Sequence, residues 1–277
     1  MKQIKDRLDI ILYERGYFTS REKAKAAVMA GIVEVDGERV LKAGVMVSPL
    51  ADINVKGPVC PYVSRGGLKL AGALDAFGLS VEAKIAVDIG ASTGGFTDCM
   101  LQRGASRVYS IDVGYGQLDW KLRTDPRVVN MERVNIRLMD PGVVPEKAAI
   151  VTVDVSFISL KLVLPTAESL LSLDGHMICL VKPQFEAGRR QVGKKGIVRD
   201  SRVHKEVIHN VMGYARENGL AARALIPSPV RGAKGNIEFL MLLSRLNPDA
   251  DEEPDLDADI FDIDAVVNTE LSLNHKQ

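Results

Sequence analysis

Residues 85–97 read IAVDIGASTGGFT, and this stretch decides which fold we expect. A short apolar run ends at Asp88 and gives way to small residues, with glycines at positions 90, 94 and 95. From Phe96 onward apolar side chains recur at helical spacing, and Thr97 can cap free backbone N–H groups at the helix start. A strand that passes through a glycine turn into a helix is typical of a nucleotide-type cofactor site at the carboxyl end of a parallel strand.

The chain from about residue 84 repeats this alternation of apolar runs and helical patterns. Strands are predicted at 85–89, 107–111, 128–131, 149–153, 177–181, 221–227 and 237–243. Helices are predicted at 96–104, 116–124, 159–172 and 201–218. This alternation indicates an α/β fold with a doubly wound sheet.

The composition is that of a soluble globular protein. Of the 277 residues, 46% are hydrophobic and 26% are charged, which fits one large domain or one large and one small domain. No apolar run is long enough to span a membrane, and the first residues, MKQIKDRLDII, are charged where a secretion signal needs an apolar stretch. We therefore expect a cytoplasmic protein. Its three cysteines, Cys60, Cys99 and Cys179, lie far apart, so we expect neither a disulfide framework nor a metal site.

The zero net charge hides an uneven distribution. Residues 247–277 hold ten acidic residues and one lysine, whereas residues 1–246 hold 35 basic and 26 acidic residues, a net +9. A basic body suggests a polyanionic partner, although an excess of this size is also common on solvated surfaces. The composition of the acidic tail suggests disorder. The alternative is a short amphipathic element that docks on the body, built from Ile260, Phe261, Ile263, Val266 and Val267.

Residues 1–58 are predicted to form a small module of two helices and a hairpin. The first amphipathic helix stops at Gly16 and the second at Gly31. Two short alternating strands flank Asp36 and Gly37, a dipeptide that favours a tight hairpin turn. The helices carry basic residues that could follow a phosphate backbone or simply form a solvated face: Arg7, Arg15, Arg21, Lys23 and Lys25.

A linker separates this module from the rest of the chain. The stretch KGPVCPYV contains two prolines and a glycine, and we place the linker at residues 59–63. After it, residues 64–67 form a turn and apolar residues from Leu68 to Phe77 lie along one side of a helix. Lys69 falls within this apolar pattern, where a lysine can simply extend its amine from the helix edge to water.

Polar residues stand where the predicted strands end. The first strand ends at Asp88, the second at Asp112, the fourth at Asp154 and the fifth at Lys182. Because ligands of doubly wound sheets bind beyond the carboxyl ends of the strands, these side chains should converge. Asp112 is placed to accept hydrogen bonds from ribose hydroxyls, which suits NAD, FAD or S-adenosylmethionine. The loop GASTGG lacks the features of a pyrophosphate loop and of a P-loop, so a cofactor without phosphates is favoured.

Lys182 follows an all-apolar strand and precedes Pro183, so we expect its amine to be partly desolvated. Desolvation lowers the pKa of a lysine from about 10.4, and a fall to about 7 or 8 lets the neutral amine accept a proton. Asp154 and Glu238 are carboxylates at apolar strands that could hold the ammonium in place. A surface lysine and structural ion pairs are the alternatives for any one of these residues.

Two sets of residues resemble known families. Residues 7–40, RLDIILYERGYFTSREKAKAAVMAGIVEVDGERV, resemble the small RNA-binding domain found in a ribosomal small-subunit protein and in pseudouridine synthases. The motifs VDIGASTGGFTD, VTVDVSFISL, LVKPQFE and GNIEF resemble the FtsJ-type S-adenosylmethionine-dependent ribose 2′-O-methyltransferases. With the module in front and SRGGLKL after the linker, residues 1–245 are similar to the TlyA haemolysin-like rRNA methyltransferases.

The resemblance implies a Lys-Asp-Lys-Glu tetrad, which maps to Lys69, Asp154, Lys182 and Glu238. It further implies that S-adenosylmethionine methylates a cytidine 2′-hydroxyl of ribosomal RNA in assembled subunits. In that picture Lys182 takes the hydroxyl proton, and the other three residues orient it and tune its charge. A 2′-hydroxyl is a poor nucleophile near neutral pH, so the reaction needs a base, and a lysine with a lowered pKa can act as one.

The resemblance also assigns binding residues and domains. The cofactor residues it implies are Asp88, Gly90, Ser92, Gly94, Gly95, Phe96, Asp112, Asn135 and Asp154. The RNA-binding residues we expect are Arg7, Arg21, Lys23, Lys25, Arg65, Lys194 and Lys195, with Arg199 in the same loop as the last two. The expected domains are an RNA-binding domain at 1–58, the linker, an FtsJ-like methyltransferase domain at 64–246 and the acidic tail at 247–277. We expect ribosomal RNA or ribosomal subunits as the partner, no membrane, no metal and a monomer.

Two features depart from the family pattern, and three other functions are less well supported by the sequence. The linker residues VCPY lack the basic and tryptophan character of some members, and the acidic tail has no counterpart in the family pattern. A membrane-lytic haemolysin is disfavoured because neither a spanning segment nor alternating barrel strands occur. A ribosome-associated RNA-binding protein without catalysis predicts a degraded tetrad, whereas all four positions are intact. An NAD-dependent enzyme is disfavoured by the glycine loop.

Overall fold

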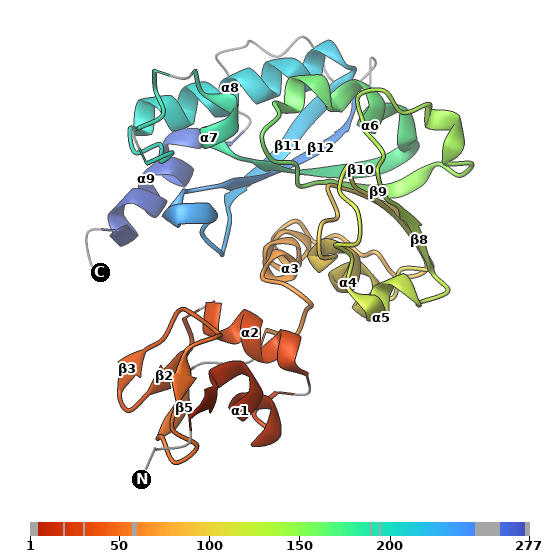
Figure 1. Ribbon diagram of the computed structural model, residues 1–277. Coiled ribbons are helices and arrows are strands. Elements are labelled where there is room, and N and C mark those ends of the chain that lie inside the picture. Colours follow the sequence, from red (N-terminus) through yellow and green to blue (C-terminus); the bar gives the residue numbers. More distant parts are fainter. Residues whose placement is uncertain are drawn as a thin grey trace. The chain divides into compact units, whose positions relative to one another are not determined.

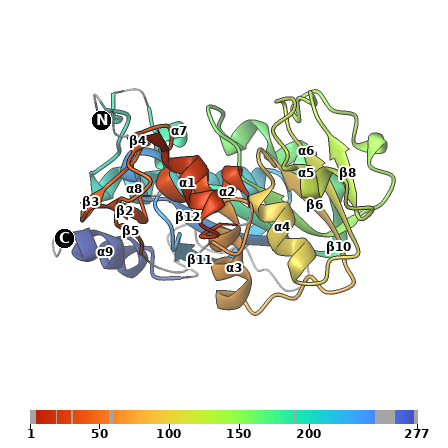
Figure 2. The same cartoon turned by 60° about the horizontal axis from the view of Figure 1, so that its bottom comes forward.

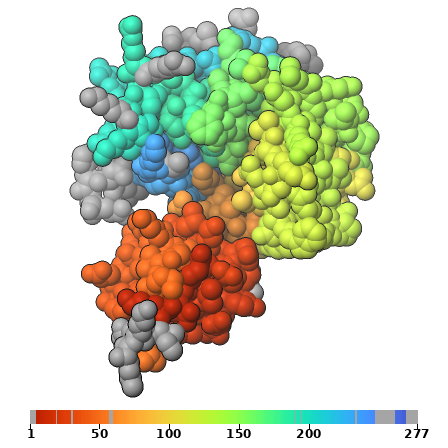
Figure 3. Space-filling view, viewed as in Figure 1, coloured from red at the N-terminus to blue at the C-terminus, as the bar shows by residue number. Residues whose placement is uncertain are grey.

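The computed structural model describes residues 5–18, 20–29, 31–56, 60–188, 190–193, 195–246 and 261–274. The chain divides into two compact units, Met1–Ser64 and Arg65–Gln277. The smaller unit is red to orange in Figure 3, and the larger unit runs from pale orange through green to blue. Within the described ranges no helix is both long and apolar enough to cross a membrane.

The smaller unit packs two helices against a small sheet. Its elements are β1 (Asp6–Arg7), α1 (Leu8–Glu14), α2 (Arg21–Met29), β2 (Val33–Val35), β3 (Glu38–Arg39), β4 (Met46–Val47) and β5 (Ile53–Val55). Leu8, Leu12 and Val28 are fully buried between the helices and the sheet β3-β2-β5. Asp36 and Gly37 both have positive φ, at 52° and 82°, which is the tight turn that the dipeptide predicts.

Arg7 lies in a strand, so its prediction as part of the first helix was wrong. β1 pairs with β4, and Asp6 and Arg7 lie opposite Val47 and Met46. The helix begins one residue later, at Leu8, because the backbone of Arg7 is still extended (φ −66°, ψ 136°).

Seven strands form the central sheet of the larger unit, in the order β11-β12-β10-β9-β6-β7-β8. Their bounds are β6 (Ile85–Ile89), β7 (Arg107–Ile111), β8 (Val128–Met131), β9 (Ala148–Val153), β10 (Leu171–Val181), β11 (Leu220–Pro227) and β12 (Phe239–Arg245). β6 to β10 pair in parallel, and β12 runs antiparallel to both of its neighbours. β6 lies between β7 and β9, so the strand order reverses at β6 and creates the switch point at which ligands bind.

Helices cover both faces of this sheet. They are α3 (Gly66–Ala76), α4 (Gly95–Gln102), α5 (Trp120–Arg123), α6 (Leu164–Leu170), α7 (Pro183–Glu186), α8 (Ser201–Glu217) and α9 (Ile263–Asn274), with 3-10 turns η1 (Pro141–Val143), η2 (Leu160–Leu162) and η3 (Ala233–Gly235). Figure 1 shows α6, α7 and α8 on one face of the sheet and α3 and α4 on the other. α3 and α4 pack against each other, as Figure 2 also shows. The predicted doubly wound α/β fold is confirmed.

Three predicted elements differ from the structure by more than two residues at one end. The helix predicted at 116–124 is a single turn, α5, because Gly116 has a φ of 69° and the Asp119 side chain caps the helix there. The helix predicted at 159–172 is divided into η2 and α6, and a proline occupies the first turn of α6, where its missing N–H costs little. β10 starts at Leu171 and not at 177, and an irregular register separates Leu171 from His176.

The C-terminal helix α9 docks on the larger unit. Ile263 and Val267 are 1% and 0% exposed and belong to the same core as the buried face of α8. An ion pair of 2.5 Å joins Lys205 of α8 to Asp264 of α9. The docking alternative is therefore correct for this part of the tail, whereas Ile260 lies outside the described residues.

The buried carboxylate of Asp88 joins three elements beneath the glycine loop. Asp88 is fully buried, and it accepts hydrogen bonds from the backbone N–H of Thr97 at 2.9 Å and from the Thr97 hydroxyl at 2.7 Å. The hydroxyl of Thr152 donates to its other oxygen over 3.0 Å. The end of β6 is thus tied to the first turn of α4 and to β9. Burial raises the pKa of Asp88 to about 6, although the hydrogen bonds from Thr97 and Thr152 oppose this shift.

We predict that Asp88 makes the larger unit less stable as the pH rises from 4 to 6. The folded state holds the proton more tightly than the unfolded chain, so its stabilising effect, about 3 kcal/mol, is present below pH 4 and lost through the folded pKa near 6. Asp88→Asn removes this titration and keeps a side chain of the same shape. Calorimetric melting at pH 4.5 and 7.5 should show a wild-type advantage over Asp88→Asn that is larger at the lower pH. A difference that does not depend on pH contradicts this account.

Candidate active site

A cavity of about 760 Å³ opens at the carboxyl ends of β6, β7 and β9. Its wall comes from the glycine loop, from the loops after β7 and β8, and from residues 154–159 after β9. The polar residues of this wall that matter below are Gly90, Ser92, Asp112, Asn135, Asp154 and Ser156. A volume of this size accommodates a nucleoside cofactor.

Glycine at position 90 allows the loop to approach the end of β9. Gly90 has a φ of 86°, and a Cβ atom built there would lie 2.3 Å from the carbonyl oxygen of Asp154. The N–H of Gly90 donates to the carbonyl of Ile111 over 2.8 Å, which fixes the loop against β7 as well. A side chain at this position would therefore push the loop away from the end of β9.

Asp112 organises the rim of the cavity. Its carboxylate accepts hydrogen bonds from the backbone N–H of Ser92 at 2.7 Å and of Gly114 at 2.6 Å. A carboxylate offers about four acceptor positions, so two are left for hydroxyl groups of a ligand. Asp112 thus joins the glycine loop to the loop after β7 and keeps acceptors for a bound ribose.

The structure separates the predicted cofactor residues into two groups. Gly90, Ser92, Asp112, Asn135 and Asp154 line the cavity. Asp88, Gly94, Gly95 and Phe96 do not line it, because each of them is turned into the protein interior. Gly94 is needed for packing, since a Cβ atom there would lie 2.2 Å from Leu122 Cδ1. These four residues therefore support the loop from the protein interior and do not face the cavity.

Two ion pairs stand at the ends of neighbouring strands. Lys182 Nζ lies 2.5 Å from Asp154 Oδ1, and Lys69 Nζ lies 2.6 Å from Glu238 Oε2. Asp154 follows β9, Lys182 follows β10 and Glu238 precedes β12, and these three strands are adjacent. The fold therefore brings together four residues that are up to 169 positions apart in the sequence.

Both pairs are shielded from water. The side chains of Lys182 and Glu238 are 9% and 3% exposed, and that of Lys69 is 12% exposed. Lys69 therefore does not extend its amine from the helix edge to water, which was the alternative expected from the sequence. Charges withdrawn from water in this way persist only when they are paired, so each lysine depends on its carboxylate.

Glu238 has two further neighbours that the sequence did not indicate. Gln184 Nε2 donates to Glu238 Oε1 over 3.0 Å, so both carboxylate oxygens are occupied. A Cβ atom on Gly232 would lie 2.0 Å from Glu238 Oε1, which leaves no room for a side chain there. The motif LVKPQFE contains Gln184, but no periodicity in the sequence distinguishes it from a surface residue.

The sequence also gave no indication of an exposed aromatic ring at the cavity, that of Phe157. Phe157 is 90% exposed and has a φ of 65°, a conformation that costs free energy for a residue with a Cβ atom. Its ring centroid lies 4.9 Å from that of Phe185, and both residues line the cavity. An apolar residue in the run VDVSFISL signals a buried position, so only the fold reveals that this ring faces solvent.

The predicted RNA-binding residues of the smaller unit lie on its surface. The buried carboxylate of Asp9 binds both Arg7, at 2.9 Å, and Arg21, at 3.1 Å. The hydrogen bond from Arg7 is the main reason that the pKa of Asp9 lies below its usual value. Both arginine side chains remain 48% exposed, and Lys23 and Lys25 are exposed on α2.

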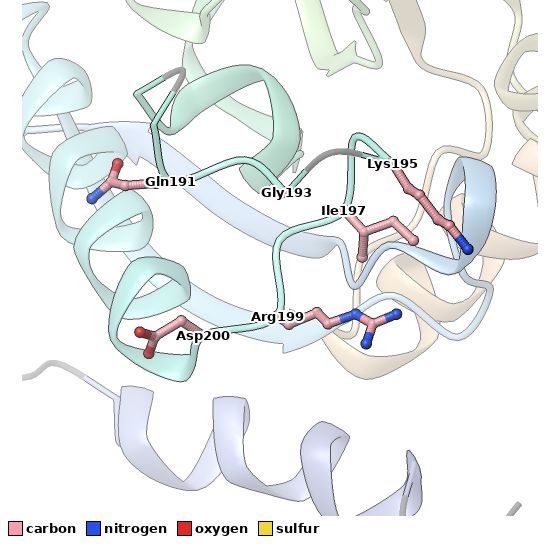
Figure 4. Close-up of a pocket in the computed structure, with 6 residues that line it drawn as sticks. All are labelled: Gln191, Gly193, Lys195, Ile197, Arg199 and Asp200. Carbon is pink, nitrogen blue, oxygen red and sulfur yellow. The ribbon is translucent and has the colours of Figure 1, made fainter.

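The predicted basic residues of the larger unit lie on the segment between α7 and α8, apart from Arg65 at the start of α3. Figure 4 shows Lys195 and Arg199 on one side of this segment and Gln191 and Asp200 on the other, around a cavity of about 340 Å³. Arg65, Lys195 and Arg199 are exposed, whereas Lys194 lies outside the described residues.

Asn236 holds this segment in place. The Asn236 side chain is 2% exposed, donates to the Gly196 carbonyl over 2.9 Å and accepts from the Val198 N–H over 3.1 Å. The segment that carries Lys195 and Arg199 is therefore fastened two residues away from Glu238.

Comparison with known proteins agrees with this geometry. Residues 62–245 match the FtsJ-like methyltransferase family, and residues 6–53 match the S4 domain. YqxC of Bacillus subtilis (strain 168), whose name describes an rRNA methyltransferase, is 52% identical over 88% of this chain and 87% of its own length. The 16S/23S rRNA (cytidine-2′-O)-methyltransferase TlyA of Mycobacterium tuberculosis is 42% identical over 86% of this chain and 89% of its own length.

A solved structure extends the likeness to nearly the whole chain. A Streptococcus thermophilus protein that carries the name hemolysin is 45% identical, with a TM-score of 0.76 over 99% of this chain and 100% of its own. Family match, relatives and fold agree. The chain belongs to the FtsJ-like methyltransferase family and carries an S4 domain in front of its methyltransferase domain.

Proposed function

We propose that this protein uses S-adenosylmethionine to methylate the ribose 2′-hydroxyl of a cytidine in ribosomal RNA, in assembled subunits. One observation carries the proposal: the pair Lys182–Asp154 stands beside the pair Lys69–Glu238 at the strand ends next to the cofactor-sized cavity. The names of the relatives in Mycobacterium tuberculosis and Bacillus subtilis support ribosomal RNA as the substrate.

The cavity suits a cofactor without phosphates. Among the described residues that line it, Arg137 alone is a cation, so a pyrophosphate with its several negative charges would find a single positive partner there. Asp112 retains acceptors for ribose hydroxyls, and Ile111, Val113, Ile136 and Val155 offer an apolar wall for a base. S-adenosylmethionine bound there would supply a sulfonium methyl group, and its sulfur would keep the electron pair of the carbon–sulfur bond when that group is transferred.

Lys182 acts as the base in this proposal. Its neutral amine accepts the proton of the 2′-hydroxyl as that oxygen bonds to the methyl carbon, and it becomes an ammonium that later releases the proton to water. Asp154 holds the amine at 2.5 Å, and Asp154 also lines the cavity, so it joins the base to the cofactor side of the site. Fixed geometry of this kind supplies much of the rate for a weak nucleophile.

Lys69 and Glu238 form a second pair next to the first. Lys69 Nζ retains two further N–H donors after its bond to Glu238, and these suit the oxygens of a ribose or its phosphate. The Gln184 amide keeps the Glu238 carboxylate in this orientation. The pair would therefore position the substrate without exchanging a proton.

The RNA contacts in the proposal extend over the basic residues described above. In the S4 domain they are Arg7, Arg21, Lys23 and Lys25, and in the methyltransferase domain they are Arg65, Lys194, Lys195 and Arg199. Lysine and arginine bind phosphates independently of sequence, so these residues supply affinity. Phe157 offers an exposed ring on which an unstacked base can lie. In this proposal the chain consists of an RNA-binding domain at 1–58, a linker at 59–63, a methyltransferase domain at 64–246 and an acidic tail at 247–277.

We predict that Lys182→Ala lowers the rate of methyl transfer at least 100-fold, because the reaction loses its base. The measurement is transfer of a labelled methyl group from S-adenosylmethionine to unmodified ribosomal subunits, followed by nucleoside analysis. Lys147→Ala, at an exposed lysine that binds the Ser169 carbonyl, is the matched control and should retain activity. Label in a base or in protein contradicts the assigned chemistry.

Asp112→Ala should weaken S-adenosylmethionine binding about 10-fold or more, because two hydrogen bonds to an ionised acceptor are lost. Isothermal titration calorimetry measures this directly, and Asp125→Ala serves as a control whose carboxylate pairs with Arg127. If the wild-type protein binds NADH and does not bind S-adenosylmethionine, the cofactor assignment is wrong.

The double variant Lys195→Gln with Arg199→Gln should reduce the salt dependence of RNA binding. Each lost phosphate contact lowers the slope of log K against log salt by about 1, so a change of about 2 is expected. Filter binding of ribosomal subunits between 50 and 200 mM salt gives the slope. The control is Arg202→Gln, because the guanidinium of Arg202 pairs with Asp200 in the wild type. An unchanged slope removes these residues from the interface.

A further inference from the structure

The hydroxyl of Ser156 lies beside the amine of Lys182. Ser156 belongs to the motif VTVDVSFISL, but no spacing in the sequence distinguishes it from its neighbours. Lys182 Nζ donates to Ser156 Oγ over 2.9 Å and contacts Asp154 Oδ1 at 2.5 Å. Ser156 and Asp154 lie in the same loop after β9, and both line the cavity. The amine therefore has two acceptors, one charged and one neutral.

Two acceptors determine how the amine is rotated. A neutral lysine amine has two N–H donors and one lone pair in a tetrahedral arrangement. With Asp154 as the only acceptor, two staggered positions about the last carbon–nitrogen bond remain, and they differ in where the lone pair lies. When Asp154 and Ser156 take one hydrogen each, a single position remains, and the lone pair points away from both acceptors. That direction is the one left for an incoming hydroxyl.

The hydrogen of the Ser156 hydroxyl is not used within the protein. In the parts of the chain that the structure describes, no residue accepts a hydrogen bond from Ser156. Because its oxygen already accepts from Lys182, this hydrogen can donate to an oxygen of a bound ribose. Ser156 is thus able to contact the base and the substrate at the same time.

We propose that Ser156 is a positioning residue, which together with Asp154 holds the Lys182 amine in the rotational state whose lone pair meets the ribose 2′-hydroxyl. This inference rests on the proposed function. The proton leaves the 2′-oxygen for Lys182 Nζ, and Ser156 neither gains nor loses a proton in the step. A serine in this role affects the rate of the chemical step and leaves cofactor binding unchanged.

The charged groups on the elements that adjoin Lys182 set the background for a pH experiment. They are Asp154 after β9, Glu238 before β12, Lys69 on α3 and Glu186 on α7. Glu186 binds the hydroxyl of Ser159 and the N–H of Leu160, and burial raises its pKa. Replacement of Ser156 leaves all four groups in place, so a change in the pH profile reports the lost acceptor.

The first experiment compares kcat against pH for the wild type and Ser156→Ala. We expect kcat on the high-pH plateau to fall about 10-fold, because one hydrogen bond to the base is lost. The acid limb should move to lower pH, because the serine oxygen stabilises the ammonium. The ratio of wild-type to variant activity should therefore shrink as the pH falls. Ser156→Thr should restore the rate, whereas Ser156→Cys, with a poor acceptor, should not.

Two results overturn the inference. One is an unchanged plateau rate in Ser156→Ala. The other is a lower rate with an unmoved acid limb and equal effects of threonine and cysteine, which indicates a structural role. Ser169→Ala, which removes a hydroxyl bound to the Thr166 carbonyl on α6, is the matched control and should behave as the wild type.

A second measurement does not depend on activity. Competitive acetylation of lysines by acetic anhydride, read by mass spectrometry at Lys182 over a range of pH, reports the pKa of this amine in the whole protein. In Ser156→Ala the midpoint should move to lower pH, and an unmoved midpoint contradicts the inference even if no RNA substrate is methylated. If the midpoint moves and no ribose is methylated by the wild type, the proposed function fails while the contact between Ser156 and Lys182 stands.

Discussion

The geometry of the larger unit depends on the buried carboxylate of Asp88. It accepts three hydrogen bonds, two from Thr97 and one from Thr152, and so ties the end of β6 to α4 and β9. A buried charge is tolerated only with such partners, and even so its pKa is raised to about 6. The glycine loop lies directly above this junction. The loop can therefore approach β7 and β9 closely, and the cavity exists because of that approach.

The two lysines of the site obey the same electrostatic rule. Each is withdrawn from water and pairs with a carboxylate on a neighbouring element, Lys182 with Asp154 and Lys69 with Glu238. In each pair the carboxylate holds the lysine amine at a fixed position. Neutral partners complete each pair, Ser156 on one side and Gln184 on the other. Each pair thus offers a fixed donor or acceptor direction, which a solvated lysine does not have.

Charge on the surface is organised differently from charge in the site. In the S4 domain the buried Asp9 aligns Arg7 and Arg21 while leaving both about half exposed. In the methyltransferase domain Asn236 fastens the backbone of the segment that carries Lys195 and Arg199. The long side chain of an exposed lysine or arginine is flexible. A fixed backbone therefore restricts the region that its charged group can reach. The acidic C-terminal part contributes Ile263 and Val267 of α9 to the core.

The sequence by itself determined the α/β fold, the glycine loop and most strand positions, because apolar periodicity and turn chemistry are local properties. β6, β7 and β8 lie where the pattern predicts them. The local pattern predicted a longer helix at 116–124 than the single turn α5. The helix starts late because Gly116 has a positive φ and Asp119 caps the first turn. The strand ends also predicted that Asp154 and Lys182 converge, whereas only the tertiary structure decided which other residues join them. Ser156, Gln184, Gly232 and Phe157 became visible as parts of the site because strands and loops distant in sequence converge at one edge of the sheet, and no periodicity encodes that convergence.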